Sequence, residues 1–426
     1  MPSRPGPVVK LGGRVRSSTR RLDTASTRGY PDAMMAVGER HRAIVIEATP
    51  GTDTQPRLAS VDVLRGLVMV VMALDHVRDF FGDTHVGATD LQHTTVALFL
   101  TRWITHFCAP VFVLLAGTSA FLWAARGRTT TALSWFLLTR GVWLIFLELT
   151  VVRFGWFFNL DYSMFVLQVI WAIGASMVIL SALVFLPTAA VAAGGIVLIA
   201  GHNLLDGVAP ERFGAFAWLW CVLHVPRPPV IYPLVPWVGV MAAGYGLGAI
   251  LLRAPAARRR QLSTLGVAMT AGFVFLRYVN RYGDPSPWAV QTSPVFTALS
   301  FINVTKYPPS LLYLLMTLGP AIAALPALER LTGPAVRVLT VYGRVPLFYY
   351  VLHIYLIHAL AIGAAYLAHP DVGALFTVAF AFPKDYGFGL PLVYVVWLVV
   401  VSSLYLPCRW FAGVKQRRHD PWLSYL

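Results

Sequence analysis

The stretch SVDVLRGLVMVVMALDHVRDFF, Ser60 to Phe81, indicates the fold class. It is apolar enough, and long enough, to cross a bilayer as a single helix, which needs about 20 residues. At helical spacing, however, one stripe collects Asp62, Arg65, Met69, Met72, His76 and Asp79. Charged groups are costly in lipid, so we expect this stripe to face the interior of a helical bundle and to mark a functional path. Snorkelling to the headgroups is the alternative explanation for its Asp and Arg residues.

The rest of the chain repeats the apolar pattern. Of its 426 residues 57% are hydrophobic and 12% charged, and the mean hydropathy is +0.65. A water-soluble helical protein would need polar faces that these segments lack. The sequence therefore predicts an all-α, polytopic transmembrane bundle of about ten spans. We place them at residues 60–82, 99–124, 132–153, 164–186, 188–205, 229–252, 263–280, 307–325, 345–368 and 390–411.

The net charge of +15 does not indicate a nucleic-acid partner, because the basic residues cluster in every second connection between spans. By the positive-inside rule, this distribution places both termini in the cytoplasm. We expect residues 1–57 to form a disordered basic cytosolic arm, 58–412 the membrane domain and 413–426 a basic cytosolic tail. A mitochondrial presequence is the alternative for the first 22 residues.

Histidines near the outer end of the first two spans are the candidates for chemistry. His76 can exchange a proton near neutral pH, and Asp79 at i+3 is placed to orient it, with Asp75 as the alternative partner. In the second span, Arg102 and His106 share one face at the depth of His76. We therefore expect both histidines to face one outer-leaflet cavity.

Several segments carry a family resemblance. The opening RLASVDVLRGLVMVVMALDHVRDFF, then THFCAPVFVLLAG, YPLVPWVGVMAAGYGLG, NVTKYPPSLLYLLMTLGP and GRVPLFYYVLHIYLIH resemble the bacterial branch of the heparan-alpha-glucosaminide N-acetyltransferase-like family over residues 57 to about 410. The spacing from Arg65 to His76 is also similar to that in a wider group of transmembrane acyltransferases. The resemblance implies acyl transfer across a bacterial inner membrane. The donor would be cytosolic acyl-CoA, with acetyl-CoA expected, and the acceptor a sugar amine or hydroxyl on the other side.

The resemblance also suggests roles for the polar residues. His76 would act as base or transient acyl carrier, and His106 as second acid/base or oxyanion partner. The candidates for binding the acceptor or the acyl group are Arg65, Arg102, Lys306, Tyr307 and His353. The candidates for holding the CoA phosphates are Arg126, Arg128, Arg258 and Arg259. In the lysosomal member the catalytic histidine lies in the loop after helix one; that position is Gly87 here, so the role is not carried over, and His85 is a weaker candidate.

The buried ionisable residues also leave a second class of function open. On physical grounds, a bundle with buried ionisable residues fits a secondary transporter or flippase for a sugar or lipid-linked glycan as well as it fits an acyltransferase. The three cysteines, Cys108, Cys221 and Cys408, are too scattered for a metal site or a disulfide framework, and no metal is expected. The bilayer, acyl-CoA and a glycan acceptor are the expected partners, and a homodimer is left open.

Overall fold

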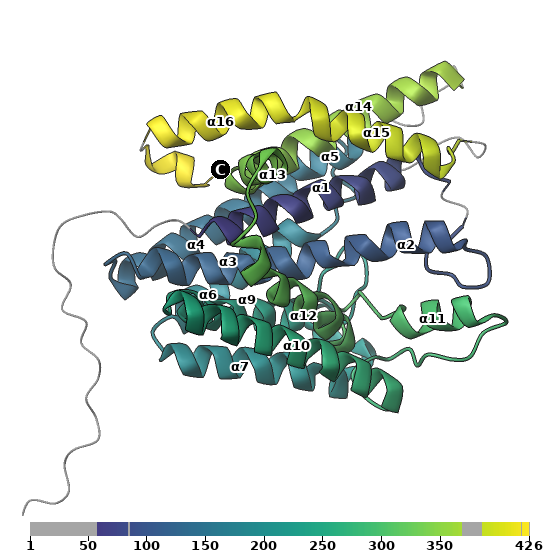
Figure 1. The fold of residues 1–426 in the computed structure, drawn as a ribbon. Coiled ribbons are helices and arrows are strands. Elements are labelled where there is room, and N and C mark those ends of the chain that lie inside the picture. The colour runs from purple at the N-terminus through teal and green to yellow at the C-terminus, as the bar shows by residue number, and fades with distance from the viewer. Residues whose placement is uncertain (1–57, 84–85, 369–385, 419, 426) are drawn as a thin grey trace, which may run out of the picture. The chain divides into compact units, whose positions relative to one another are not determined.

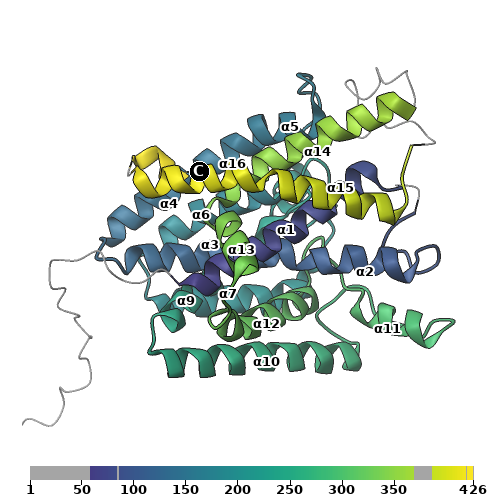
Figure 2. The same cartoon turned by 45° about the horizontal axis from the view of Figure 1, so that its top comes forward.

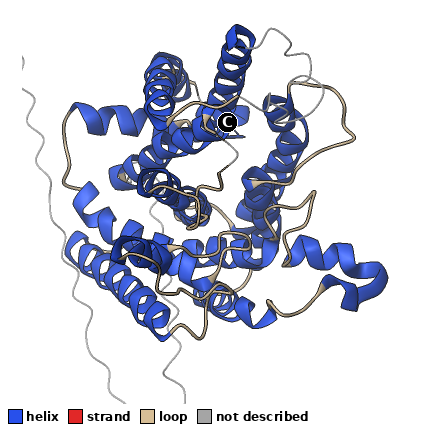
Figure 3. Cartoon of the chain, turned by 90° about the vertical axis from the view of Figure 1, so that its right-hand side faces the viewer, coloured by secondary structure: helices blue, strands red, loops and turns tan. Residues whose placement is uncertain are grey.

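The computed structural model describes residues 58–83, 86–368, 386–418 and 420–425. Within these ranges the regular structure is helical, and the only β-type pairs are isolated bridges (Figure 3). The predicted all-α class is therefore confirmed. The predicted basic arm, residues 1–57, and the candidate His85 lie outside the described residues.

Among the described residues, eight helical runs are long and apolar enough to cross a membrane, and each coincides with a predicted span. Three of these runs contain two α-helices each. The first consists of α2 (Val96–Ile104), η1 (Thr105–Phe107) and α3 (Cys108–Ala124), and the second of α4 (Thr130–Leu147), η2 (Glu148–Val152) and α5 (Arg153–Phe157). The third consists of α15 (Leu390–Ser403) and α16 (Tyr405–Arg417). The others are α7 (Thr188–Gly201) with η3 (His202–Leu205), α9 (Leu234–Leu251), α10 (Pro255–Val279), α12 (Leu311–Leu328) and α14 (Pro346–Ala368).

The two remaining predicted spans are helical but atypical. α1 (Ala59–Phe81) carries the charged stripe, and α6 (Val169–Leu183) has only 15 residues. At 1.5 Å per residue, α6 is about 22 Å long, against a hydrocarbon core of about 30 Å. A multi-pass membrane architecture is thus supported, while the count of ten spans and the cytoplasmic position of both termini remain predictions.

Three short helices were not predicted. They are α8 (Ala217–Leu223), which follows η4 (Pro210–Phe216), α11 (Pro294–Ile302) and α13 (Pro334–Arg344). The sequence of α13 was interpreted as a basic connection, because it is short and contains Arg337 and Arg344. Its contact with α1 makes it the most consequential of the three.

Helix α1 lies at the centre of this arrangement, with α3, α12, α13, α14 and α15 packed around it (Figures 1 and 2). Its contact with α13 is the closest. A Cβ atom on Gly66 would lie 1.8 Å from the carbonyl oxygen of Leu339, and one on Gly343 would lie 1.9 Å from that of Asp62. The two backbones therefore touch, as small residues permit in membrane bundles. This contact fixes α13 against the N-terminal half of α1.

The same kind of packing joins α3 to α9. A Cβ on Gly117 would lie 2.0 Å from the carbonyl oxygen of Met241, and one on Gly244 would lie 2.1 Å from that of Leu114. Thr118 adds a hydrogen bond across the contact, since its hydroxyl donates to the Gly244 carbonyl at 2.9 Å. Helices α10 and α12 also lie side by side (Figure 1). These close pairs contact α1 through α3 and α12.

Candidate functional site

Two histidines from helices far apart in the sequence meet inside the bundle. Nδ1 of His76, on α1, lies 2.7 Å from Nε2 of His353, on α14, and the two rings are nearly parallel. His353 is fully buried, whereas His76 is partly buried. His353 was predicted only as a substrate-binding residue. The structure makes it the hydrogen-bond partner of His76.

The second nitrogen of His353 determines which atoms carry the protons. Its Nδ1 lies 3.1 Å from the backbone carbonyl oxygen of Tyr349. Because a carbonyl can only accept, a neutral His353 carries its proton on Nδ1 and accepts at Nε2. His76 must then donate from Nδ1, which leaves its lone pair on Nε2. So assigned, the pair holds His76 in the tautomer whose Nε2 can take a proton or attack a carbonyl carbon.

Aromatic side chains surround this histidine pair. The Trp156 ring, from α5, meets His76 edge-on at a centroid distance of 5.0 Å. Tyr350, three residues before His353 on α14, meets the two histidine rings at 6.2 and 5.4 Å. Bulky rings on two sides restrict the orientation of the His76 imidazole and keep bulk water from it.

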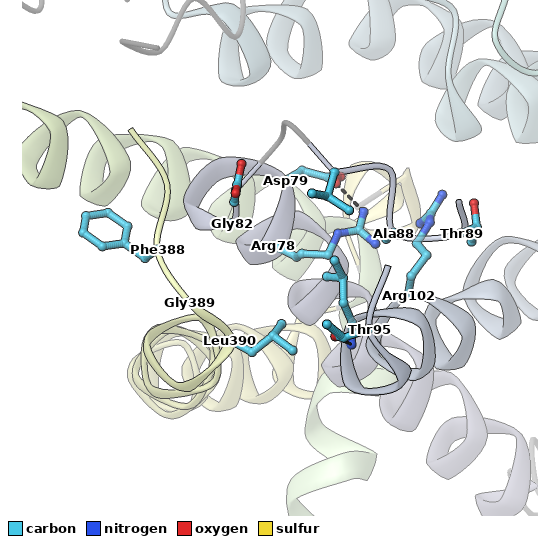
Figure 4. Close-up of a pocket in the computed structure, with 13 residues that line it drawn as sticks. Arg78, Asp79, Gly82, Ala88, Thr89, Thr95, Arg102, Phe388, Gly389 and Leu390 are labelled. Atoms are coloured by element: carbon cyan, nitrogen blue, oxygen red, sulfur yellow. Dashed lines mark hydrogen bonds and ion pairs between the residues drawn. The ribbon is translucent and has the colours of Figure 1, made fainter. Parts of the chain in front are cut away.

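A cavity of about 530 Å³ lies at the C-terminal end of α1. We call it the Arg102 cavity. Figure 4 shows Arg78, Asp79 and Arg102 at its wall, with Phe388, Gly389 and Leu390 on another side. Thr89 and Thr95 contribute further polar groups. The Arg102 cavity therefore presents two guanidinium groups together with hydroxyl groups.

Asp75 holds these cations in place. Nη1 of Arg102 lies 2.7 Å from its Oδ1, and Nη2 of Arg78 lies 3.0 Å from the same oxygen. Nζ of Lys306 lies 3.9 Å from Oδ2 and 5.2 Å from the centre of the Tyr307 ring. Three cations around one largely buried carboxylate leave a local excess of positive charge. Lys306 and Tyr307 therefore support the wall of the Arg102 cavity from behind, and neither of them lines it.

A second, larger cavity of about 760 Å³ lies beside the N-terminal half of α1. We call it the basic cavity, because its lining includes Arg65, Arg126, Arg140, Arg258, Arg344 and Lys415, with Asp62 as its acidic residue. Apolar side chains line the remainder, among them Met69, Met72 and Leu144. Tyr350, which faces both histidines, also belongs to this lining.

The predicted stripe of α1 thus connects two cavities. Asp62, Arg65, Met69 and Met72 line the basic cavity, and Asp79 lines the Arg102 cavity. Among the described residues, the two cavities share no lining residue. His76 lines neither but lies between them on α1, in a segment from Met72 to Arg78 that spans about 9 Å. The prediction that this face of α1 lies inside the bundle is confirmed.

The four arginines predicted for CoA binding separate into two groups. Arg126 and Arg258 line the basic cavity, and Arg258 is held by Glu329, with Nε 2.8 Å from Oε1. Arg128 instead places its guanidinium 4.5 Å from the centre of the Trp123 ring, and Arg259 is not part of the cavity lining.

The structure differs from the predicted histidine site in two respects. Asp79 pairs with the neighbouring Arg78, so it does not orient His76. His106 lies apart from the histidine pair, with its ring 5.4 Å from that of Tyr313, and it lines neither cavity. The physical reason is the tight η1 turn at Thr105–Phe107, which advances about 120° per residue where an α-helix advances 100°. His106 is thereby carried about 40° further around the helix from Arg102, and its ring lies against Tyr313.

Sequence reasoning missed Trp156, Tyr350, Arg140, Arg344 and Lys415 as parts of the site. The last three carried a signal, because each is a basic residue within or next to a predicted span. Trp156 and Tyr350 carried none, since aromatic residues are common throughout this chain.

One family of known proteins matches this chain. The model for the catalytic region of heparan-alpha-glucosaminide N-acetyltransferase matches residues 57–279, a little over half of the chain. The match includes α1 and the two basic segments that carry Arg126, Arg128, Arg258 and Arg259. No individual curated protein matches the chain. The matched region includes His76, Arg102 and most of the lining of the basic cavity. Because the match covers more than half of the chain, the chain belongs to the heparan-alpha-glucosaminide N-acetyltransferase family of membrane acetyltransferases.

Proposed function

We propose that this protein transfers an acetyl group from acetyl-CoA, bound in the basic cavity, to a sugar amine or hydroxyl bound in the Arg102 cavity. The observation that carries the proposal is the His76–His353 pair, placed between two polar cavities at opposite ends of one helix. By the predicted topology the basic cavity opens to the cytoplasm of a bacterial inner membrane and the Arg102 cavity opens outward.

The basic cavity suits an acyl-CoA in charge and in shape. Arg126, Arg258, Arg344 and Lys415 supply positive groups for the CoA phosphates, which arginine binds with two parallel hydrogen bonds. The apolar part of the cavity, along Met69 and Met72, leads toward His76. A pantetheine arm lying there would carry its thioester toward the histidine pair.

The separation of the cavities favours a transfer in two steps through His76. In the first step, the Nε2 lone pair attacks the thioester carbonyl and the carbon–sulfur bond breaks, so CoA leaves as a thiolate. The resulting acylimidazolium keeps its Nδ1 proton and donates it as a hydrogen bond to Nε2 of His353, along the 2.7 Å contact. In the second step, the acceptor nitrogen or oxygen attacks the acetyl carbon from the Arg102 cavity, the bond from that carbon to Nε2 breaks, and His76 leaves as a neutral imidazole. The acceptor then loses its own proton to water on that side, and the CoA thiolate takes one from water on the other. A direct transfer with His76 as base would require both substrates at one point.

The Arg102 cavity suits a polar, neutral or anionic acceptor. Arg78 and Arg102 donate hydrogen bonds, and the Thr89 and Thr95 hydroxyls can donate or accept them. The two guanidinium groups could also stabilise the oxyanion that forms when the acceptor attacks the acetyl carbon.

The test uses the full-length protein purified in detergent with labelled acetyl-CoA. Wild type should release CoA in the presence of an amino sugar, and brief mixing without acceptor should leave label on the protein. His76→Ala should lose both signals while it still shows a thermal shift with acetyl-CoA, because the basic cavity is intact. His93→Ala, a change at an exposed histidine, is the matched control. Unchanged turnover in His76→Ala would exclude this site. Binding without any CoA release would favour the transporter or flippase instead.

A further inference from the structure

A cluster of side chains that could bind a metal ion lies at the end of α7, apart from both cavities. His202, in η3, Asp206, one turn later, and His224, at the C-terminal end of α8, place one ligand atom each within 4.8 Å of one another. We propose that these three residues bind a divalent transition-metal ion, zinc in the first place. This proposal is independent of the transfer reaction.

The burial of the two imidazoles is the strongest argument for a ligand. His202 is 2% exposed and His224 is 1% exposed. In the described part of the chain, neither ring nitrogen of His202 makes a hydrogen bond of ordinary geometry, although the Pro309 carbonyl faces the ring. Nδ1 of His224 also has no partner there. Buried polar nitrogens without partners are costly, and coordination of one His202 nitrogen to a metal would remove part of that cost.

The geometry is already close to that of a zinc site. Nε2 of His224 lies 3.2 Å from Oδ1 of Asp206. Two ligands with zinc bonds of 2.0 to 2.1 Å at the tetrahedral angle lie about 3.4 Å apart. The two histidine rings are 5.7 Å apart and meet edge-on at 67°, and the ligand atoms of all three residues lie within 4.8 Å of one another. Two imidazoles and one carboxylate, with a water as fourth ligand, is a known zinc donor set.

A supporting residue orients the carboxylate. Nδ2 of Asn203 donates to Oδ2 of Asp206 at 2.8 Å, and its Oδ1 accepts the backbone N–H of Leu311 at 2.9 Å. Leu311 is the first residue of α12. Metal ligands are regularly held by such outer hydrogen bonds. Here the bonds tie the proposed site to two membrane helices, α7 and α12.

The position of the cluster suggests a structural role. The η4–α8 segment between Asp206 and His224 exposes large apolar side chains, with Phe216 65% and Trp218 64% exposed. A bound metal would fix both ends of this segment. We expect the metal to hold the apolar surface of the η4–α8 segment, which suits the membrane interface, against the end of α7. The cluster departs from the prediction that the chain has no metal site, which considered only the cysteines.

The test measures metal in the full-length protein, purified through an affinity tag that contains no histidine. Wild type should contain about one zinc ion per chain, as a mononuclear site requires. His202→Ala and His224→Ala should lose it. His93→Ala should keep it, because His93 also pairs with an aspartate, Asp90, but has no third ligand beside it. Loss of zinc in His93→Ala to the same extent would contradict the assignment.

A second measurement does not depend on how well the variants fold. Zinc added back to chelator-treated wild type should raise the melting temperature in a concentration-dependent way, as any ligand of the native state does. Asp206→Asn, which keeps the shape of the side chain, should weaken this response. Cobalt in place of zinc should give the visible absorption of a tetrahedral site. Wild type that contains no zinc and shows no thermal response to added zinc would overturn the proposal.

Discussion

The contact between His76 and His353 allows a sharp prediction about the chemistry. Replacing His353 with Leu removes the acceptor and leaves the Nδ1 proton of His76 without a partner in a buried site. An unsatisfied buried donor costs about 1 to 3 kcal/mol, and each 1.36 kcal/mol is a factor of ten in rate. If that cost falls on the transition state, acetyl transfer should slow by about 5- to 150-fold.

His353→Gln is the matched control. The carbonyl oxygen of Gln can accept the His76 proton, and its amide can donate to the Tyr349 carbonyl, so the tautomer of His76 is preserved. We expect this variant to retain activity within about one order of magnitude of wild type. The assay is the initial rate of CoA release from acetyl-CoA with a saturating amino sugar. Because neither variant changes a residue that lines the basic cavity, the KM for acetyl-CoA should stay constant while kcat changes.

Two results would refute this reasoning. Equal activity of His353→Leu and wild type would show that the hydrogen bond does not prepare His76. Equal loss in His353→Leu and His353→Gln would show that the imidazole itself, rather than an acceptor at this position, is required. Thermal unfolding of both variants must be compared, because a loss of folded protein would mimic a loss of rate.

Three further changes test other parts of the structure. Gly343→Ala would place a methyl carbon 1.9 Å from the carbonyl oxygen of Asp62, so we expect the protein to lose about 1 to 3 kcal/mol of stability. The loss should appear as a lower melting temperature, and an unchanged melting temperature would mean that α13 can move. Asp75→Asn removes the negative charge shared by three cations and should lower the free energy of unfolding in denaturant by about 3 to 5 kcal/mol. An unchanged free energy of unfolding would show that water screens the three cations. Arg126→Ala should raise the KM for acetyl-CoA about tenfold and Arg128→Ala should not; equal effects would place the phosphates elsewhere.

Much of the fold could be predicted from the sequence, because lipid imposes strict requirements on length and hydropathy. All ten predicted spans contain helices, including the charged α1 and the short α6. The short helix α13 could not be found this way. It lies against the backbone of α1 through Gly66 and Gly343, and a short basic segment carries no sign of such a contact.

The site was predicted only in part, for a different physical reason. The stripe on α1 was visible because the charged residues of one helix follow a fixed period. The pairing of His76 with His353 joins residues 277 positions apart, and no local pattern encodes it. The expected pairing with Asp79 failed because Arg78, its neighbour, satisfies that carboxylate first. The displacement of His106 required knowledge of a single tight turn.

Among the described residues the two cavities share no lining residue, and under the proposed transfer this has a consequence for the host cell. A group of two carbons can be handed over by a single imidazole, so neither the nucleotide donor nor water has to travel from one compartment to the other. A cell could therefore carry out this reaction continuously without proton leakage through the protein. Vesicles that contain the protein should stay impermeable to ions while they consume the donor.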